Sequence, residues 1–381
     1  MNWNVPLADL DYDEQEQQAV MDVLQSRWLT MGEVTRQFEE QFAAMLGSQY
    51  AFAVSNATVA LHLSCLALGI GPGDEVILPA LTFVATANAV LYTGAQVRFA
   101  DIIGPDEPTI DPEEIDRLVT PQTKAVIVMH YGGFPCRMPE IMERAEKYKL
   151  RVIEDAAHAP GASLENRSLG SWGDIGCFSF FSNKNLSTGE GGMLVTNDEA
   201  IAQKVRLLRS HGMTSLTWDR HQGHAYTYDV VELGYNYRID EIHSALGIVQ
   251  LRKLARNNER RKEITQIYWQ ILKDTRLGLP FQTQATQLSV KPAFHIFPIV
   301  LPEGIIRTDF IDSLRHSRIQ TSIHYPPIHQ FQYYRNIYPY QKLSHTEDFA
   351  AREVTLPLFP GMSQEQLLQV TDVIKVYLSQ D

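Results

Sequence analysis

RVIEDAAH (151–158) begins as a short apolar run and ends in two adjacent carboxylates, Glu154 and Asp155, before a small-residue turn. Such a run predicts a buried strand of a parallel sheet, and ligands bind at the carboxyl ends of strands in sheets of this kind. Leaving a carboxylate unpaired in an apolar interior costs roughly several kcal/mol. Asp155 therefore needs a cationic partner or solvent, and capping of a following helix remains an alternative role.

Strand and helix patterns alternate on both sides of this stretch. Helical stretches fall between successive apolar runs up to 151–155, and such alternation predicts an α/β fold with a mostly parallel central sheet and helices on both faces. The predicted strands are 50–55, 75–79, 96–100, 125–130, 151–155, 175–179 and 193–196, and the helices between the first five are 58–68, 84–93, 111–119 and 138–148.

The flanking segments complete the expected architecture. Two helices precede the sheet, and Gly47 suits the end of the second. After residue 199 come a helix, a polar loop rich in Gly, His and Tyr, a long charged helix and a mixed tail. We expect a large domain over 1–250, which includes the N-terminal arm and helices, and a smaller C-terminal α/β domain over 251–381. The flanking predictions are helices over 13–26, 34–46, 199–210, 239–272, 309–315 and 363–378, a strand over 294–301, and loops over 211–229 and 275–288.

FSFFSNKNLSTGEGGM (178–193) places one lysine, Lys184, between an aromatic strand and a glycine-rich turn. An apolar neighbourhood disfavours the ammonium and lowers the pKa of a lysine, which makes the free amine available for Schiff-base chemistry. A surface lysine at a turn is the alternative. Pyridoxal phosphate (PLP) requires a lysine for its aldehyde and a carboxylate for its ring nitrogen, so Lys184 and Asp155 together fit this cofactor.

Two further junctions suit the rest of such a cofactor. Ala57 and Thr58 stand where a strand enters a helix, and the free N–H groups and helix dipole there favour a phosphate. Plain capping by Ser55 or Asn56 is the alternative at this place. Phe83, after another strand, offers an aromatic plate for the ring or a core side chain.

Composition excludes several classes of function. The 381 residues carry a formal net charge of −12, which disfavours nucleic-acid and anionic-membrane binding because both require a basic face. No stretch approaches the roughly 18 apolar residues of a membrane span, and no signal peptide is evident, so we expect a cytoplasmic protein. The three cysteines lie in apolar stretches and favour reduced thiols. His324 and His329 flank two prolines and do not form a helical metal pair, so no metal site is expected.

With these motifs in place, the chain resembles the PLP-dependent sugar aminotransferases of the DegT/StrS type, which have the fold-type-I aminotransferase architecture. The resemblance runs nearly end to end and rests on eleven motifs in order. They are SRWLTMG (26–32), SNATVALHL (55–63), GIGPGDEVILP (69–79), TFVATANA (82–89), EDAAHAPGA (154–162), FSFFSNKN (178–185), GEGGM (189–193), RSHGM (209–213), GYNYRIDEIHSALG (234–247), HYPPIH (324–329) and LPLFPG (356–361).

The resemblance implies a role for each matching residue. Lys184 would form the Schiff base with the cofactor and move the proton, and Asp155 would pair with the pyridinium nitrogen. It also implies a homodimer with a shared active site, because Asn236 would reach the phosphate of the neighbouring subunit. The implied cofactor residues are Ala57, Thr58, Phe83, Asp155, His158, Ser179, Lys184 and Asn236, and the implied substrate residues are Thr30, Arg238, His324 and Tyr325.

Departures from the family pattern refine the expected reaction. His158 stands where many members have Gln, and His occurs in several members that act at the sugar C4. Related dehydratases replace the catalytic lysine by histidine, so Lys184 favours transamination. Many members have Gly at the position of Ala57, where a backbone N–H remains in either case.

We therefore expect amination of a nucleotide-linked keto-(deoxy)sugar at C4, with glutamate as donor, for the synthesis of a polysaccharide or antibiotic sugar. The alternatives are amination of a 3-keto sugar or keto-cyclitol, and a non-catalytic regulatory relative. The intact pair of Asp155 and Lys184 argues against the last of these.

Overall fold

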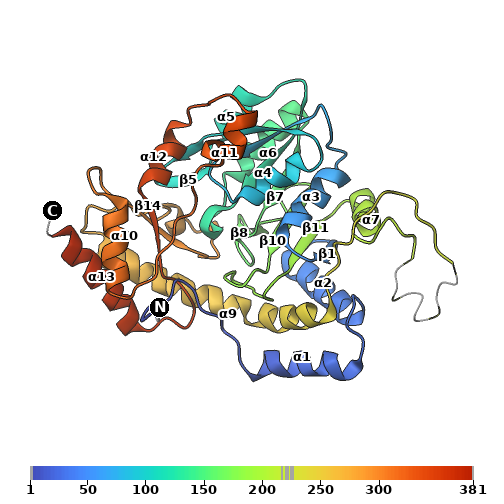
Figure 1. Ribbon diagram of the computed structural model, residues 1–381, viewed down its shortest axis with the longest axis horizontal. Coiled ribbons are helices and arrows are strands. Elements are labelled where there is room, and N and C mark those ends of the chain that lie inside the picture. Colours follow the sequence, from blue (N-terminus) through green and yellow to red (C-terminus); the bar gives the residue numbers. More distant parts are fainter. Residues whose placement is uncertain (1–2, 216–217, 219–222, 224–226, 380–381) are drawn as a thin grey trace.

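A seven-stranded sheet forms the centre of the computed structural model, which describes residues 3–215, 218, 223 and 227–379 (Figure 1). The strand order is β1-β11-β10-β7-β6-β2-β3. Every neighbouring pair from β10 to β3 is parallel, whereas β11 runs antiparallel to both β1 and β10. The predicted α/β class with a mostly parallel sheet is confirmed. The strands are β1 (Tyr50–Val54), β2 (Glu75–Pro79), β3 (Gln96–Ala100), β6 (Thr123–Met129), β7 (Arg151–Asp155), β10 (Ile175–Ser179) and β11 (Gly192–Thr196).

Helices cover both faces of this sheet, as the alternating pattern predicts. In β1, Ala51 and Ala53 pack into one core cluster, and Phe52 and Val54 pack into another, because successive side chains point to opposite faces. The first face is covered by α2 (Glu33–Leu46), α5 (Pro112–Leu118), α6 (Met138–Tyr148) and part of α9 (Glu241–Leu272), and the second by α3 (Ala57–Ala67), α4 (Val84–Leu91) and α7 (Glu199–Leu208).

The C-terminal part builds a third core cluster around a two-stranded antiparallel sheet of β13 (Phe297–Val300) and β14 (Glu353–Leu356). The helices α10 (Arg307–His316) and α13 (Gln364–Leu378) pack against each other over it. Helix α9 connects the parts, since Leu254 belongs to the core of the large sheet and Ile264 to the C-terminal cluster. The boundary at 250/251 stays a prediction.

Several short elements escaped prediction. They are the hairpin β4 (Ile102–Gly104) and β5 (Glu107–Ile110), the small sheet β8 (Ser163–Leu164), β9 (Arg167–Ser168) and β12 (Val290–Lys291), strand β14, helices α11 (Gln332–Ile337) and α12 (Ser344–Arg352), and the 3-10 turns Tyr131–Gly133, Gln284–Thr286 and Ile328–Gln330. Each is too short to carry a clear hydrophobic period. Of the predicted loop 211–229, residues 216–217, 219–222 and 224–226 lie outside the described residues.

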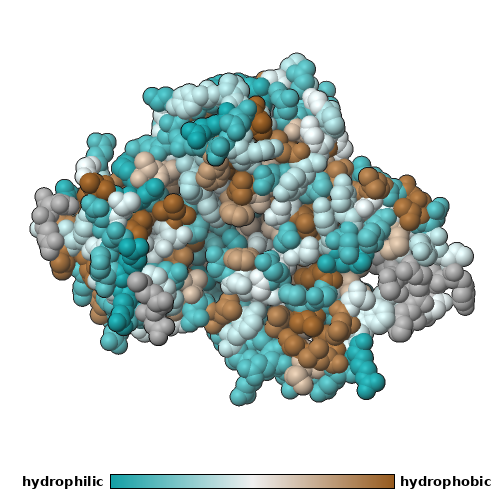
Figure 2. Space-filling model, in the orientation of Figure 1, coloured by the Kyte–Doolittle hydropathy of each residue, from teal (hydrophilic) through white to brown (hydrophobic). Residues whose placement is uncertain are grey.

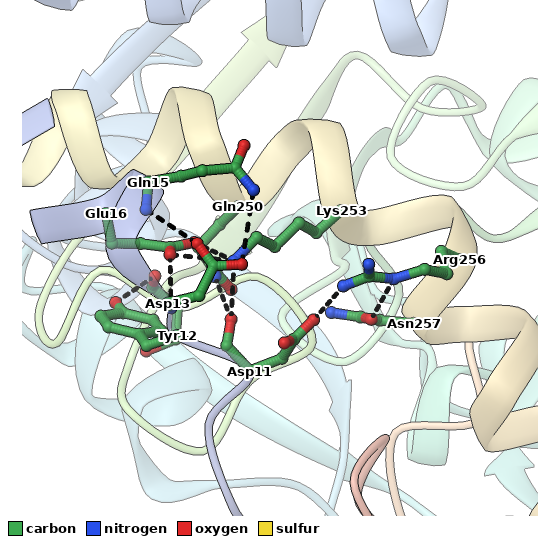
Figure 3. A network of polar contacts seen from close by, with 10 residues as sticks. Asp11, Tyr12, Asp13, Gln15, Glu16, Gln250, Lys253, Arg256 and Asn257 are labelled. Carbon is green, nitrogen blue, oxygen red and sulfur yellow. Dashed lines mark hydrogen bonds and ion pairs between the residues drawn. The ribbon is translucent and has the colours of Figure 1, made fainter. Parts of the chain in front are cut away.

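The N-terminal arm is fastened to α9 by buried polar contacts (Figure 3). Helix α1 (Glu14–Ser26) runs along α9. It begins with a capping box formed by Asp13 and Glu16. The Lys253 ammonium of α9 is 6% exposed and lies 2.8 Å from a Glu16 carboxylate oxygen and 2.9 Å from one of Asp13. Of the helices described, none is both long and apolar enough for a bilayer crossing.

Candidate active site

The two carboxylates that end β7 face opposite sides of the sheet and have different surroundings. Glu154 is fully buried, and its carboxylate accepts the backbone N–H groups of Gly170, Trp172 and Gly173 at 2.6–2.7 Å. The Nε2–H of His130 donates the fourth contact at 2.9 Å. Glu154 therefore anchors a turn, and its acceptor capacity is used by the fold.

Asp155 points the other way, with a carboxylate that the fold satisfies only in part. The Thr86 hydroxyl donates to Oδ2 at 2.7 Å, and the Ala157 N–H donates to Oδ1 at 3.2 Å. Burial raises the pKa of this carboxyl, against the lowering effects of these hydrogen bonds and of the Lys184 charge. Residues 156–162 form turns, so the alternative role as a helix cap is wrong. A cation beside Asp155 would stabilise its ionised form.

Lys184 lies in the turn after β10, where its backbone N–H donates to Phe181 O at 2.8 Å. Burial lowers the pKa of its amine to about 8, and the Asp155 charge opposes that shift. In the described part of the chain, no ion pair forms between Lys184 and a carboxylate within 4.0 Å. The charges of Lys184 and Asp155 are thus close enough to interact. A gap of more than 4.0 Å separates the Lys184 amine from the Asp155 carboxylate.

The predicted phosphate residues meet at one end of three neighbouring strands. The register aligns Val54 of β1 with Gly192 of β11, and Gly192 with Ser179 of β10. A Cβ atom on Gly192 would lie 2.8 Å from the Ala57 nitrogen, so only glycine lets the start of α3 approach β11 this closely. Ala57 and Thr58 therefore open α3 beside the Ser179 hydroxyl.

Asn56 caps the helix at this junction, but it binds only one of the free backbone N–H groups at the start of α3. The Asn56 side chain accepts the N–H of Val59 at 3.0 Å. The first N–H groups of a helix have no intrahelical partner, so those of Ala57 and Thr58 are suited to a bound anion.

Phe83 and Tyr325 form an aromatic pair. Phe83 precedes α4 and is 55% exposed, so the alternative that it is a core side chain is wrong. Its ring centroid lies 5.9 Å from that of Tyr325. An exposed aromatic face at the end of a strand provides a surface on which a planar ring can stack.

The proton positions of His158 and Tyr325 follow from their partners. The Gly132 N–H donates to His158 Nδ1 at 3.3 Å, so Nδ1 carries a lone pair. Burial, followed by the charge of Lys184, holds the pKa of His158 far below its usual range, and the neutral ring therefore has its proton on Nε2. This Nε2–H donates to the Tyr325 oxygen at 2.9 Å. Burial raises the pKa of Tyr325, so its own proton remains available to an acceptor in the site.

His324 is fixed by contacts with β14. Its backbone N–H donates to Glu353 Oε2 at 2.8 Å, and its Nδ1 contacts the Thr355 hydroxyl at 2.8 Å. Burial lowers the pKa of its ring to about 3, with a further contribution from the Lys184 charge. The ring centroid of the neutral His324 lies 6.4 Å from the ring centroid of His158.

The remaining predicted residues, Thr30, Asn236 and Arg238, form isolated backbone bridges with other segments. Arg238 pairs with Val54 at the end of β1, and the exposed residues Thr30 and Asn236 pair with Asp240 and Ser210. No hydrogen bond or ion pair joins Thr30, Asn236 or Arg238 to the Lys184 gap within the described residues. Their predicted roles rest on the resemblance.

Sequence reasoning missed Thr86, although its spacing contained a signal. Phe83 and Thr86 are three residues apart at the start of one helix, and such positions share a face. Asn185, Asn258 and His295 were also missed, since nothing in their separate sequence contexts relates them. Among the described residues, no group of three or more metal-binding side chains is found.

These groups fit pyridoxal phosphate part by part. The Lys184 amine suits its aldehyde and Asp155 its ring nitrogen, while Phe83 suits its ring face. The cradle kept open by Gly192 suits its phosphate.

Comparisons with known proteins match this chain to one aminotransferase family. The family described as DegT/DnrJ/EryC1/StrS aminotransferase matches residues 10–375. Spore coat polysaccharide biosynthesis protein SpsC of Bacillus subtilis is 39% identical over 372 residues, which are 95% of this chain and 94% of that protein.

Solved structures extend the likeness to the fold. PseC of Helicobacter pylori, an aminotransferase involved in the biosynthesis of pseudoaminic acid, matches with a TM-score of 0.91 and 29% identity over 100% of both chains. The PLP form of the putative sugar aminotransferase Spr1654 of Streptococcus pneumoniae matches with a TM-score of 0.90 and 25% identity, over 100% of this chain and 99% of that one. A pyridoxamine phosphate form of Spr1654 was also solved.

Proposed function

Because this chain belongs to the DegT/DnrJ/EryC1/StrS aminotransferase family and is a PLP-dependent sugar aminotransferase, we propose that its substrate is a nucleotide-linked keto-(deoxy)sugar. The amino group would come from an amino acid, glutamate by preference, and would be placed at C4 of the sugar. The observation that carries the proposal is that the Lys184 amine lies close enough to the Asp155 carboxylate for their charges to interact, yet forms no ion pair with it within 4.0 Å.

The chain's own residues divide the proton transfers and the binding. When bound, the cofactor supplies an aldehyde that holds the amino group and a ring that takes up electrons. Lys184 would accept the proton from the α-carbon of the amino donor and later deliver one to the carbon of the keto-sugar. Its lowered pKa suits this exchange, because a base is most effective when its pKa lies near the working pH.

Other groups would hold charge and orientation around that transfer. Asp155 would keep the ring nitrogen protonated, and Thr86 would fix the carboxylate by its hydrogen bond. Tyr325 would donate its proton to an acceptor oxygen, because His158 already donates to the tyrosine oxygen.

The choice of sugar carbon and pathway has separate support. His158 stands where several family members that act at C4 have the same residue. SpsC takes part in spore coat polysaccharide synthesis and PseC in pseudoaminic acid synthesis, so a role in making an amino sugar for a polysaccharide or an antibiotic fits both relatives.

We also propose a cytoplasmic homodimer with a shared active site. Figure 2 shows hydrophobic residues gathered over α2 and the end of α1, where Met21 and Leu24 are 48% and 46% exposed. An exposed apolar patch of this kind supports association. Asn236 is exposed, as a residue that reaches into a neighbouring subunit must be. Three buried free cysteines support a reducing compartment.

A substrate panel tests the reaction directly. PLP-loaded enzyme would be incubated with glutamate and, separately, with nucleotide-linked 4-keto sugars, 3-keto sugars and a keto-cyclitol, and the products would be identified by mass spectrometry and NMR. We expect an aminated 4-keto sugar, and borohydride treatment should fix the cofactor on Lys184. Lys184→Ala is the control and should give no product.

The same panel separates the alternatives. Amination of only a 3-keto sugar or the keto-cyclitol would replace the C4 proposal. No product from any keto substrate, with PLP nevertheless bound, would favour a regulatory relative.

A further inference from the structure

We propose that helix α9 is a positioning element for Lys184, acting directly through Asn258 and indirectly through the N-terminal arm. The inference rests on the proposed function, because it assigns Lys184 the role of the reacting amine. It concerns three residues that lie outside the cofactor gap: Asn185, Asn258 and Tyr12. Two separate sets of contacts carry it.

Asn185, the residue after Lys184, has every hydrogen-bonding group of its side chain engaged. Its Nδ2 donates to Asn258 Oδ1 at 2.8 Å and to Ala293 O at 2.7 Å. Its Oδ1 accepts the Nδ1–H of His295 at 2.9 Å. The side chain is 95% buried, so the contacts are not replaced by water. The chain next to Lys184 is thereby fixed to two other segments.

Asn258 extends this contact to the segment that carries the other half of the site. While its Oδ1 accepts from Asn185, its Nδ2 donates to Pro160 O at 2.9 Å. Pro160 lies five residues after Asp155 and two after His158. A Cβ atom on Gly161 would lie 2.9 Å from Asn258 Nδ2, which shows how closely this turn packs on α9. One side chain of α9 therefore joins the turn after Asp155 to the turn that carries Lys184.

The second set of contacts runs through the N-terminal arm (Figure 3). Lys253 and Gln250 of α9 bond to Glu16 and to the backbone oxygen of Asp11. These contacts place Tyr12, whose hydroxyl donates to Ser187 O at 2.8 Å. Ser187 is buried and lies three residues after Lys184. The Lys184 segment is thus held at two points, and both lead to residues 250–258 of the same helix.

The contacts of Asn185 and Ser187 fix the backbone that follows Lys184, and this backbone sets the position and the surroundings of the amine. The amine is held in a partly buried place at a set separation from Asp155, and both factors act on its proton affinity. Freeing the segment would admit water and let the amine move away from the cofactor aldehyde. A small displacement of a reacting group is enough to lower a rate strongly.

The test measures how pH controls covalent capture of PLP by the full-length protein after its cofactor has been removed. The unaltered protein should show a rate that rises to a midpoint near pH 8, the pKa of Lys184. In Asn258→Ala we expect the midpoint to rise by about one pH unit and the capture rate below it to fall roughly tenfold. Tyr12→Phe removes a single hydrogen bond without changing shape and should shift the midpoint in the same direction by less.

Two further variants separate positioning from general destabilisation. Leu314→Ala opens a cavity in the C-terminal core cluster, which does not include Leu254 of α9, and should lower the melting temperature without moving the midpoint. Asn258→Asp keeps the size of the side chain and the acceptor for Asn185, and it gives a second measurement if the alanine variant does not fold. Its midpoint should also rise, because the bond to Pro160 O is lost and the new negative charge favours the ammonium form of Lys184.

An unchanged midpoint and capture rate in folded Asn258→Ala, or in folded Asn258→Asp when the alanine variant is lost, would overturn the proposal. An equal midpoint shift in Leu314→Ala would do the same. Capture of PLP needs no sugar, so failure of the substrate panel leaves this measurement valid, and the two proposals fail separately.

Discussion

At the scale of single residues, the site depends on how two adjacent carboxylates are used. Within the described residues Glu154 accepts four hydrogen bonds, whereas Asp155 accepts two and interacts with the Lys184 charge. Burial pushes the pKa of Asp155 upward and that of Lys184 downward, so both groups are held in a less charged state than they would have in water. Such opposed shifts are typical of reacting groups.

Replacing Asp155 tests its charge. In Asp155→Asn we expect kcat to fall by ~10²–10³, because removal of one preorganised charge typically has that effect. PLP should still be captured by Lys184, with a midpoint below pH 8, because the Asp155 charge raises the pKa of the amine. Steady-state kinetics and the capture rate measure the two effects. Thr86→Val is the control, since it removes one hydrogen bond and keeps the charge; normal turnover in Asp155→Asn would contradict the assignment.

Glu353 predicts a pH dependence of stability. Burial raises the pKa of its carboxyl from 4.5 to about 8. Between these values the folded chain keeps the proton that the unfolded chain releases, so the stabilising contribution is complete below pH 4.5 and is lost as the pH rises through 8. The side chain in Glu353→Gln stays neutral at every pH. The free energy of unfolding of this variant, minus that of the unaltered protein, should therefore increase by on the order of a few kcal/mol from pH 5 to pH 8.

Urea unfolding at pH 5–9 would measure that difference. Exposed Glu303 provides the matched control, and Glu303→Gln should leave the pH dependence as it is. A constant difference between Glu353→Gln and the unaltered protein across this range would refute the argument.

At the scale of elements, the cofactor cradle depends on close packing between a strand and a helix. Strand β11 is the antiparallel member of the sheet, and it carries Gly192 between Val54 and Ser179. The first residues of α3 approach Gly192 so closely that a Cβ atom would lie 2.6 Å from the carbonyl carbon of Asn56. We propose that this helix N-terminus and strand end together bind the cofactor phosphate.

Gly192→Ala should separate α3 from β11 and weaken PLP binding. We expect the dissociation constant for PLP to rise about tenfold, which corresponds to ~1.4 kcal/mol. Fluorescence titration of the protein without cofactor would measure it. Gly71→Ala is a matched glycine control, because its Cβ atom would meet only Thr93 O at 3.9 Å. An unaltered affinity in Gly192→Ala would show that the phosphate does not use this junction.

At the scale of the whole molecule, α9 joins two cores and the N-terminal arm. Leu254 packs in the core of the large sheet and Ile264 in the C-terminal core, while Lys253 holds α1. A rigid helix that contacts all these parts fixes the position of the Lys184 turn relative to the segment 293–295 and to the turn after Asp155. The proposed dimer would add the last contribution, from Asn236.

Mixed dimers test that contribution. Lys184→Ala removes the reacting amine, and Asn236→Asp places a negative charge where the partner's phosphate is proposed to bind. Each variant alone should have little activity, whereas refolding them together should restore about a quarter of normal turnover, since half the dimers are mixed and half of their sites are intact. Turnover after mixing, at equal total protein, is the measurement. No recovery from two folded, dimeric variants would contradict a shared site.

Much of the fold could be read from local patterns. The helices and strands of the large sheet have clear periods, and their predicted bounds agree with the structure within a few residues. The short elements after residue 328 were missed because they are held by contacts with distant segments. The Tyr338 hydroxyl oxygen, for example, accepts the Val97 N–H at 2.9 Å. The orientation of β11 was equally open, since an apolar run has the same pattern in either direction.

By itself the sequence determined the fold class, the family resemblance and the pairing of Asp155 with Lys184 as a hypothesis, because those depend on residue types and short spacings. Only the tertiary structure decided which carboxylate faces the amine, that Phe83 is exposed, which nitrogen of His158 carries the proton, and that Asn258 joins the two turns. The physical reason is that burial and hydrogen-bond partners are set by segments far apart in the chain, and no local period records which of them will meet.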